Sequence, residues 1–141
     1  MNWKYEDKEV LSLDDVPKGA VGFIYIIVDS EGYFYIGKKS FYSTITRPPL
    51  KGTKRKRKVT KESSWLNYKS SNKTVKEWED WEIKNKTIIN YAYTKKHLTY
   101  LECHALFTLN CLRNKMCLND NILGKFFSSD LDFLPDNEEV K

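Results

Sequence analysis

The most regular hydrophobic segment of the chain is Gly22–Val28, which is apolar or aromatic at every position after the glycine. Alternate side chains form two apolar faces, with Phe23, Tyr25 and Ile27 on one and Ile24, Ile26 and Val28 on the other. A segment that is apolar on both faces predicts a strand in the centre of a sheet. Asp29–Gly32 predicts a turn, and the aromatic and β-branched segment Tyr33–Gly37 predicts the second strand of a β-hairpin.

This hairpin would place Tyr25 and Tyr35 on neighbouring strands, where two phenols can face one site. Gly37 closes the second strand and leaves room for a backbone or a phosphate to approach closely. Each tyrosine alone is better explained as an ordinary sheet aromatic, because the chain contains 9 tyrosines. The hairpin acquires functional meaning only together with other residues.

Two short helices are predicted after the hairpin. Ser63 or Ser64 can cap the first, which carries Trp65 and Tyr68 three positions apart on one side. Asn72–Lys84 has the apolar spacing of a second helix. We expect the aromatic side chains of the first helix to belong to the core rather than to stack on nucleic-acid bases.

A third strand and a long helix follow. Thr87–Tyr93 alternates and is rich in β-branched and aromatic residues, which predicts a strand. Thr94 can cap a helix that continues to about Asn114. Its apolar positions follow the helical period and define the face toward the sheet: Leu98, Leu101, Ala105, Leu106, Leu109 and Leu112.

Glu102 falls inside this apolar stripe. Burying a carboxylate without compensation costs on the order of several kcal/mol, and a bound divalent cation or a lysine would supply the compensation. A glutamate at the edge of the stripe that reaches water, or pairs with Lys95, is the structural alternative. If the helix packs on the hairpin sheet, Glu102 and the two tyrosines approach one concave surface.

Composition bounds the class of protein. A chain of 141 residues is the size of one domain, and 40% apolar and 14% aromatic residues exclude a disordered chain. No apolar stretch approaches the roughly 20 residues that span a bilayer, and the N-terminus has no basic region followed by an apolar segment. We therefore expect a soluble single module without an export signal.

The three cysteines, Cys103, Cys111 and Cys117, are odd in number and form no Cys-x-x-Cys pair. This favours reduced thiols in a cytoplasm over a disulfide framework. A zinc site that combines them with His97 and His104 is the alternative, but the spacings match no ligand pattern.

The net charge of +5 comes from one segment, Lys51–Lys61, which carries seven basic residues and no acid. The rest of the chain sums to 5 − 7 = −2. Such a run predicts a solvated basic loop (residues 51–61) that can bind a polyanion through counterion release. A merely solubilising loop or a nuclear-localisation-like string is the alternative. The candidate DNA contacts are Lys38, Lys39, Lys54, Arg55, Lys56, Arg57 and Lys58.

The order of these features resembles the GIY-YIG endonucleases, and within them the small phage-borne, homing-type members related to the Seg group. The features are the hairpin Gly22-Phe23-Ile24-Tyr25 and Tyr35-Ile36-Gly37, the basic segment, Trp65-x-x-Tyr68-x-Ser70-Ser71, the third strand, the helix with a central Glu102, and Leu118-Asn119. The first motif departs slightly, with one extra residue between the glycine and the tyrosine. The likeness covers roughly residues 21–127, preceded by an N-terminal arm (1–20) and followed by an acidic tail (128–141).

The resemblance implies an α/β fold of the α+β type: a small sandwich with a central three-stranded antiparallel sheet flanked by helices. It also implies divalent-metal-dependent cleavage of DNA, with Mg²⁺ or Mn²⁺ bound by Glu102. By the same likeness Tyr25, Tyr35 and Asn119 are catalytic. Arg47 is the nearest candidate for the family's arginine, although Lys38, Lys39 or a residue of the basic loop could take that role. Tyr42 and Tyr68 compete for a further position, usually histidine or tyrosine.

The implied reaction is phosphodiester hydrolysis at one metal ion, with Tyr35 as the candidate general base for the attacking water and Tyr25 orienting it. A phenol with a pKa near ~10 needs a neighbouring cation for this role. The runner-up is a nucleic-acid-binding module that uses the basic loop but does not cut, and a structural accessory protein is a weaker third. We expect DNA as the partner, no membrane, the host cytoplasm if the chain is phage-encoded, and either a monomer or a homodimer.

Overall fold

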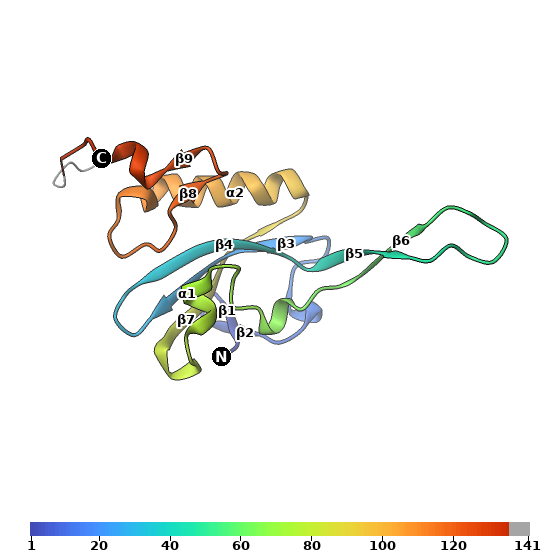
Figure 1. Cartoon of the computed structure of the whole chain (residues 1–141). Helices are drawn as coiled ribbons and strands as arrows, with labels where there is room; N and C mark the ends of the chain where they lie inside the picture. Colours follow the sequence, from blue (N-terminus) through green and yellow to red (C-terminus); the bar gives the residue numbers. More distant parts are fainter. Residues whose placement is uncertain (136–141) are drawn as a thin grey trace.

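The computed structural model describes residues 1–135, and its central element is a five-stranded sheet (Figure 1). The strands are β1 (Trp3–Tyr5), β2 (Lys8–Val10), β3 (Gly22–Asp29), β4 (Phe34–Ser40) and β7 (Ile83–Ala92). Their order in the sheet is β2-β1-β7-β3-β4, so that β4 lies at one edge. Strand β1 runs parallel to β7, and the other neighbours are antiparallel. The α+β class is therefore confirmed, and the sheet is wider than the three strands expected.

The additional strands come from the N-terminal segment, which was expected to be an arm. Trp3 is fully buried, and its indole Nε1 donates a hydrogen bond of 2.7 Å to the carbonyl oxygen of Trp65. The Trp3 ring also packs edge-on against Phe23, with 5.1 Å between the ring centroids. Because an indole buried in this way belongs to the core, residues 1–20 form part of the same unit as the hairpin.

Two helices and five short 3₁₀ turns complete the chain over residues 1–135. They are η1 (Leu13–Asp15), η2 (Trp65–Asn67), α1 (Lys73–Glu77), η3 (Asp80–Glu82), α2 (Lys95–Thr108), η4 (Cys111–Arg113) and η5 (Ser128–Leu131). Figure 1 shows α2 on one side of the sheet and α1 on the other. An aromatic core that includes Phe23 and Trp65 lies on the side of η2 and α1, and an aliphatic core that includes Ile24 and Leu98 lies beneath α2.

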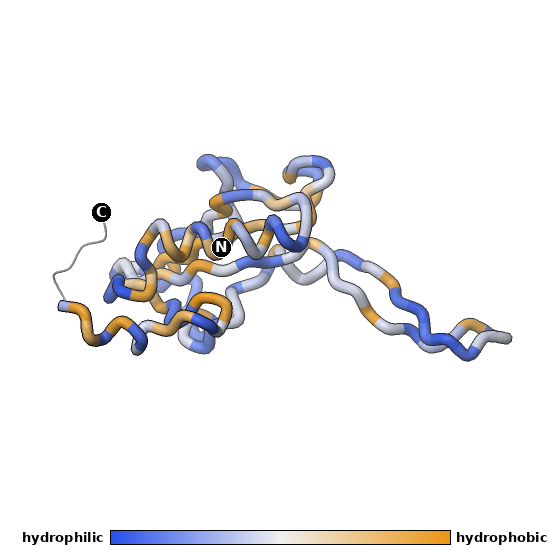
Figure 2. Tube along the Cα trace, turned by 90° about the horizontal axis from the view of Figure 1, so that it is seen from above, coloured by the Kyte–Doolittle hydropathy of each residue, from blue (hydrophilic) through white to orange (hydrophobic). Residues whose placement is uncertain are grey.

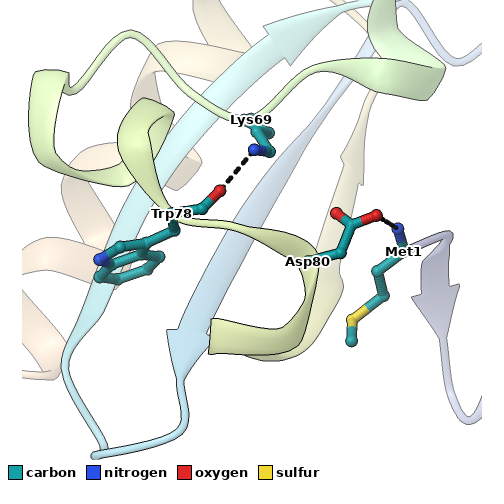
Figure 3. A network of polar contacts seen from close by, with 4 residues as sticks. All are labelled: Met1, Lys69, Trp78 and Asp80. Atoms are coloured by element: carbon teal, nitrogen blue, oxygen red, sulfur yellow. Dashed lines mark hydrogen bonds and ion pairs between the residues drawn. The ribbon is translucent and has the colours of Figure 1, made fainter.

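The helix predicted over Asn72–Lys84 is much shorter than expected. Asn72 caps it by accepting a hydrogen bond from the Val75 N–H, but the backbone becomes extended at Trp78. Figure 3 shows two contacts of this segment: the Lys69 Nζ donates to the Trp78 carbonyl oxygen at 2.5 Å, and the Met1 amino group lies 3.6 Å from the Asp80 carboxylate. Ile83 then already begins β7, which therefore starts earlier than the Thr87 of the sequence prediction.

Helix α2 begins as predicted, with the Thr94 hydroxyl accepting from the His97 N–H at 2.9 Å. It ends at Thr108 rather than near Asn114, because Asn110 adopts a left-handed conformation with φ of +51°. The predicted apolar stripe therefore ends at Leu106. Leu109 is 44% exposed, and Leu112 belongs to the separate turn η4.

The basic loop is largely a second β-hairpin. Strands β5 (Tyr42–Arg47) and β6 (Arg57–Glu62) pair in antiparallel register, with Arg47 opposite Arg57 and residues 48–56 at the tip. Figures 1 and 2 show this ribbon projecting away from the rest of the molecule. Its β-branched residues explain why a charged segment still forms strands: Thr44 pairs with Thr60, Ile45 pairs with Val59, and Thr46 lies opposite Lys58.

The C-terminal part adds a small ribbon of β8 (Asn121–Ile122) and β9 (Phe126–Phe127). Of the predicted acidic tail, Ser128–Leu131 form η5, and Asp136, Glu138 and Glu139 lie outside the described residues. Between residues 1 and 135, no helix combines the length and the apolar character that crossing a bilayer requires.

Candidate active site

Tyr25 and Tyr35 lie on β3 and β4 of the central hairpin, with 6.4 Å between their ring centroids. The register pairs Tyr25 with Gly37, which places Tyr35 diagonally across from Tyr25 on the same face. A Cβ atom at position 37 would overlap the phenol of Tyr25, since the Cζ atom lies only 2.5 Å from that position. Gly37 thus makes room for the ring of Tyr25, rather than for a phosphate.

The loop before α1 brings two hydroxyl groups to these phenols. Ser70 interacts through its side chain with both Tyr25 and Tyr35, and Ser71 with Tyr35. Ser70 is 1% exposed, and its Oγ accepts a hydrogen bond of 2.8 Å from the Asn72 N–H. Its hydroxyl hydrogen is therefore free to donate toward a phenol oxygen.

Sequence reasoning assigned no role to Ser70. Its backbone has φ of +105°, a region that residues with a side chain rarely adopt. The serine pair after Tyr68 belonged to the pattern that carried the family resemblance. However, a serine in front of a predicted helix equally indicates a cap, so the sequence did not reveal its contacts with the phenols.

Tyr68 is a third phenol at this place. Its ring packs edge-on against Tyr25, with 6.0 Å between centroids, and the Lys39 ammonium lies 4.4 Å from the centroid of the Tyr68 ring. Tyr42, the competing candidate, is 45% exposed at the base of the projecting ribbon. The structure therefore brings Tyr68, and not Tyr42, into contact with the predicted tyrosine pair.

The environment keeps the phenols protonated. Burial raises the pKa of Tyr25 well above its usual value, and the hydrogen bond with Ser70 only partly opposes this effect. Burial also raises the pKa of Tyr35, opposed by the hydrogen bond with Ser71 and reinforced by the nearby negative charge of Glu102. In the free protein both groups are therefore neutral hydrogen-bonding groups at physiological pH.

Glu102 projects from α2 into a pocket of about 320 Å³ that Tyr35 and Asn119 also line. Helix α2 covers the opposite side of the sheet from the aromatic core, so Tyr35 and Glu102 approach each other around the edge strand β4. Burial raises the pKa of the Glu102 carboxyl, and the positive charge of Lys38 opposes the shift. Glu102 is half-buried and opens to the pocket, so it is not enclosed in a dry core.

Asn119 binds the middle of β4 through both ends of its amide. Its Oδ1 accepts from the Ile36 N–H at 2.9 Å, and its Nδ2 donates to the Ile36 carbonyl oxygen at 2.7 Å. Next to it, the Leu118 N–H donates to the Phe34 carbonyl oxygen at 2.8 Å, so this segment pairs along the open edge of β4. Asn119 thereby fixes the strand that carries Tyr35.

In a comparison with known protein families, residues 3–123 match the family described as "Putative endonuclease segE, GIY-YIG domain". This match covers most of the 141 residues, including both tyrosines, Glu102 and Asn119. The chain belongs to the SegE GIY-YIG family. Neither a curated protein nor a solved structure matches it in the corresponding comparisons. As a GIY-YIG protein the chain is a nuclease of the endonuclease class, and DNA is its substrate.

Within this GIY-YIG domain, Arg47 lies apart from the phenols and Glu102. It ends strand β5 in the projecting ribbon, is exposed, and faces Arg57. Among the basic residues, Lys38 and Lys39 on β4 are the ones in contact with the site, Lys38 through the charge of Glu102 and Lys39 through the ring of Tyr68. The prolines after Arg47 allow a strand end there, which explains why no helix brings this arginine back.

The oxygen donors at the pocket fit a hard cation that keeps part of its water shell. Besides Glu102, the residues Asn72, Asp120 and Asn121 line the same pocket. Mg²⁺ typically binds proteins through one or two carboxylates and retains several waters. Within residues 1–135 no group of three His, Cys, Asp or Glu side chains forms a metal site, so a zinc centre built from the cysteines is not supported.

The cysteines are free thiols. Cys111 and Cys117 contact each other through their side chains, and the Cys117 Sγ lies 3.2 Å from the Asn119 Oδ1. In this GIY-YIG domain Cys111 is part of the aliphatic core, and Cys103 and Cys117 pack against it.

Proposed function

We propose that this GIY-YIG protein hydrolyses DNA phosphodiester bonds with one divalent metal ion, Mg²⁺ or Mn²⁺, bound through Glu102. The observation that supports this most is the shared pocket: Tyr35 of β4 and Glu102 of α2, far apart in sequence, line one cavity at the edge of the sheet. A half-buried carboxylate with a raised pKa is destabilised in its charged form, which favours a bound cation beside it.

When bound, such an ion would act as a Lewis acid for the phosphoryl oxygen and would stabilise the leaving oxygen. In this proposal Tyr35 orients the attacking water through its hydroxyl group. Because Tyr35 is protonated in the free protein, its use as a general base requires positive charge nearby. Lys38 and Lys39 bring that charge from the same strand.

Tyr25, Ser70 and Asn119 act in this proposal through Tyr35 rather than on the DNA. Tyr25 is 1% exposed and packs against the Tyr35 ring, so it has little surface to offer a phosphate. Ser70 interacts with both phenols, and Asn119 fixes the backbone next to Tyr35. These are positioning residues for the side chain that meets the water.

The DNA would be attracted to exposed basic residues, because lysine and arginine side chains neutralise phosphates. They lie on β4 and on the projecting ribbon: Lys38, Lys39, Lys54, Arg55, Lys56, Arg57 and Lys58. All are exposed except Lys39, which is partly covered. Arg47 joins this set by its position, in place of the catalytic role first expected for it.

The test is nicking of supercoiled plasmid with Mg²⁺ or Mn²⁺ and an EDTA control. Glu102→Gln keeps the shape but removes the charge, and we expect it to lower the rate by at least about 100-fold, since the proposed metal ligand is lost. Tyr35→Phe should lower it by about 10-fold or more. Glu77→Gln and Tyr93→Phe, at exposed positions of α1 and after β7, are the matched controls.

Full activity of Glu102→Gln would exclude the proposed metal site. If the unaltered chain binds DNA in a salt-sensitive way but shows no metal-dependent cutting, the alternative function, a nucleic-acid-binding module, is supported instead.

A further inference from the structure

The ribbon of β5 and β6 is separate from the central sheet. Its two strands pair only with each other, and most of its residues are exposed. Figures 1 and 2 both show it extending away from the sheet. An isolated two-stranded hairpin is at best marginally stable in water, so an element of this kind gains order when it meets a partner.

The base of the ribbon is nevertheless firmly attached. Phe41 is fully buried and packs edge-on against Trp65 with 4.9 Å between centroids. The Ser63 N–H donates to the Phe41 carbonyl oxygen at 2.8 Å, and the Ser63 Oγ donates to the Ser40 carbonyl oxygen at 2.6 Å. The ribbon therefore leaves the body in a fixed direction, as a continuation of the strand that carries Tyr35.

One face of the ribbon carries an unfavourable charge arrangement. Arg47 and Arg57 lie directly opposite each other, and like charges in this position repel. The Arg57 Nε makes a long hydrogen bond of 3.4 Å to the Pro48 carbonyl oxygen, which leaves most donors of its guanidinium available. A polyanion placed against this face would relieve the repulsion.

The same face carries an apolar pair. Because side chains alternate along a strand, Ile45 and Val59 lie beside the two arginines, and both are only partly covered. Arginine reads guanine through O6 and N7, and apolar side chains contact the methyl group of thymine, both in the major groove. These β-branched side chains favour the strand conformation, and the part of them that stays uncovered adds an apolar surface that phosphate binding alone does not require.

We propose that this ribbon enters the major groove of duplex DNA and reads its sequence with Arg47, Arg57, Ile45 and Val59. The dimensions agree, since the major groove is about 12 Å wide and admits a two-stranded ribbon. Each strand has six residues and spans roughly 20 Å. The ribbon would then determine which DNA sequence the nuclease recognises. This inference rests on the proposed function only in assuming that the recognised DNA is cut.

The geometry also limits where the cut falls. Arg47, at the far end of β5, follows Tyr35 by twelve residues of extended chain, which is at most roughly 41 Å. At 3.4 Å per base pair, the bases that are read lie within about twelve base pairs of the phosphate that is cut. Reading and cutting are therefore expected within about one turn of the same duplex.

The test uses the full chain in EDTA, where binding proceeds without cutting. The chain selects duplexes from a pool whose central segment is random, and the bound duplexes are sequenced. The enriched duplex is then treated with dimethyl sulfate, with and without the protein. This reagent methylates guanine N7 in the major groove, so bound guanines are protected. We expect an enriched motif with protected guanines. Arg47→Gln/Arg57→Gln should lose both the motif and the protection, whereas Lys4→Ala/Lys8→Ala, which removes the same charge at the opposite edge of the sheet, should keep them.

Any one of three results would overturn the inference. The bound duplexes could share no motif, the chain could prefer single-stranded DNA, or the double arginine variant could give the same footprint as the unaltered chain. Ile45→Ser/Val59→Ser keeps every charge and removes the methyl groups, so its enriched motif should lose thymine positions while its phosphate contacts persist. Failure of the chain to cut the enriched duplex with Mg²⁺ or Mn²⁺ would contradict the proposed endonuclease mechanism but not this groove readout.

Discussion

Ser70 is held in an unfavourable backbone conformation by its surroundings. Non-glycine residues at positive φ cost of order 1–3 kcal/mol, and they persist where neighbouring structure demands it. Here the Lys69 bond to the Trp78 carbonyl and the Asn72 bond to the Ser70 hydroxyl close the loop on either side. The hydroxyl that results from this strain lies against the two phenols.

Ser70→Gly and Ser70→Ala separate the strain from the hydroxyl. Both remove the contact with Tyr25 and Tyr35, so both should lower the cleavage rate by a similar factor, about 10-fold. Ser70→Gly also relieves the backbone, and its free energy of unfolding in urea should exceed that of Ser70→Ala by about 1 kcal/mol. If Ser70→Gly keeps its cleavage activity and only the less stable Ser70→Ala loses it, then Ser70 only supports the fold.

Lys86 is a buried charge away from the nuclease site. It is 4% exposed, with its ammonium 4.3 Å from the centroid of the Trp3 ring, and burial lowers its pKa to about 8. The folded pKa lies below the unfolded value of 10.5, so the unfolded chain binds more protons between these two values. The contribution of Lys86 to stability therefore rises with pH through this interval.

Lys86→Met should accordingly raise the free energy of unfolding at pH 7 by about 1–3 kcal/mol, because no charge has to be buried. The advantage should shrink toward pH 10, where the lysine of the unaltered protein is neutral. Urea unfolding of both proteins at pH 7 and 9.5 measures this difference. A gap that is constant or widens with pH would contradict the assignment.

At the scale of elements, the central hairpin depends on Gly37. Its neighbour across the strands is Tyr25, whose ring occupies the space where a Cβ would lie. Gly37→Ala should destabilise the protein by about 1–3 kcal/mol, as overpacking does, and should displace Tyr25 and lower cleavage. In the background of Tyr25→Leu the same change should cost clearly less, and a double-mutant cycle by urea unfolding measures this coupling. Equal costs in both backgrounds would mean that the overlap is absorbed elsewhere.

The sequence predicted those elements whose signal is local. The alternation of Gly22–Val28 placed Tyr25 beside Tyr35, and Thr94 capped α2 as expected. Glu102 was found because a carboxylate inside an apolar stripe has to be compensated, and the structure shows it half-buried beside Lys38. Each of these inferences used only neighbours within one hairpin or one helix.

Features that depend on distant contacts could not be predicted. The polar-looking start of the chain becomes β1 and β2 because Trp3 finds space among core residues beside Trp65, more than sixty positions away. The helix expected over Asn72–Lys84 ends at Glu77, and Ile83 instead pairs with Asp29 in the central sheet. Nothing near Ser70 in sequence indicates that its hydroxyl meets two tyrosines of another hairpin.

At the scale of the whole molecule, charge and chemistry are divided between two regions. The segment Lys51–Lys61 carries seven positive charges on the ribbon, and the remainder of the chain is slightly acidic, at −2. The body that holds Tyr35 and Glu102 therefore gains little electrostatic attraction to DNA on its own. Affinity should come from the ribbon.

The salt dependence of DNA binding tests this division. Each phosphate contact steepens the slope of log K against log salt concentration by about 0.9. Lys54→Gln/Lys56→Gln/Lys58→Gln should make the slope shallower by about 3, whereas Lys4→Gln/Lys8→Gln/Lys76→Gln, with equal charge removed from the body, should leave it unchanged. Fluorescence anisotropy across a salt series gives both slopes, and an equal effect of the two triple variants would place the DNA elsewhere.

The position of the ribbon tip has a further consequence for how the chain can be divided. A break between residues 48 and 56 would leave Tyr35 on one fragment and Glu102 on the other, while β3 still pairs with both β4 and β7. The two pieces would stay associated through the intact sheet, each carrying half of the catalytic groups. The protein is thus naturally suited to being made as two inert polypeptides that regain nuclease activity only when they reassemble.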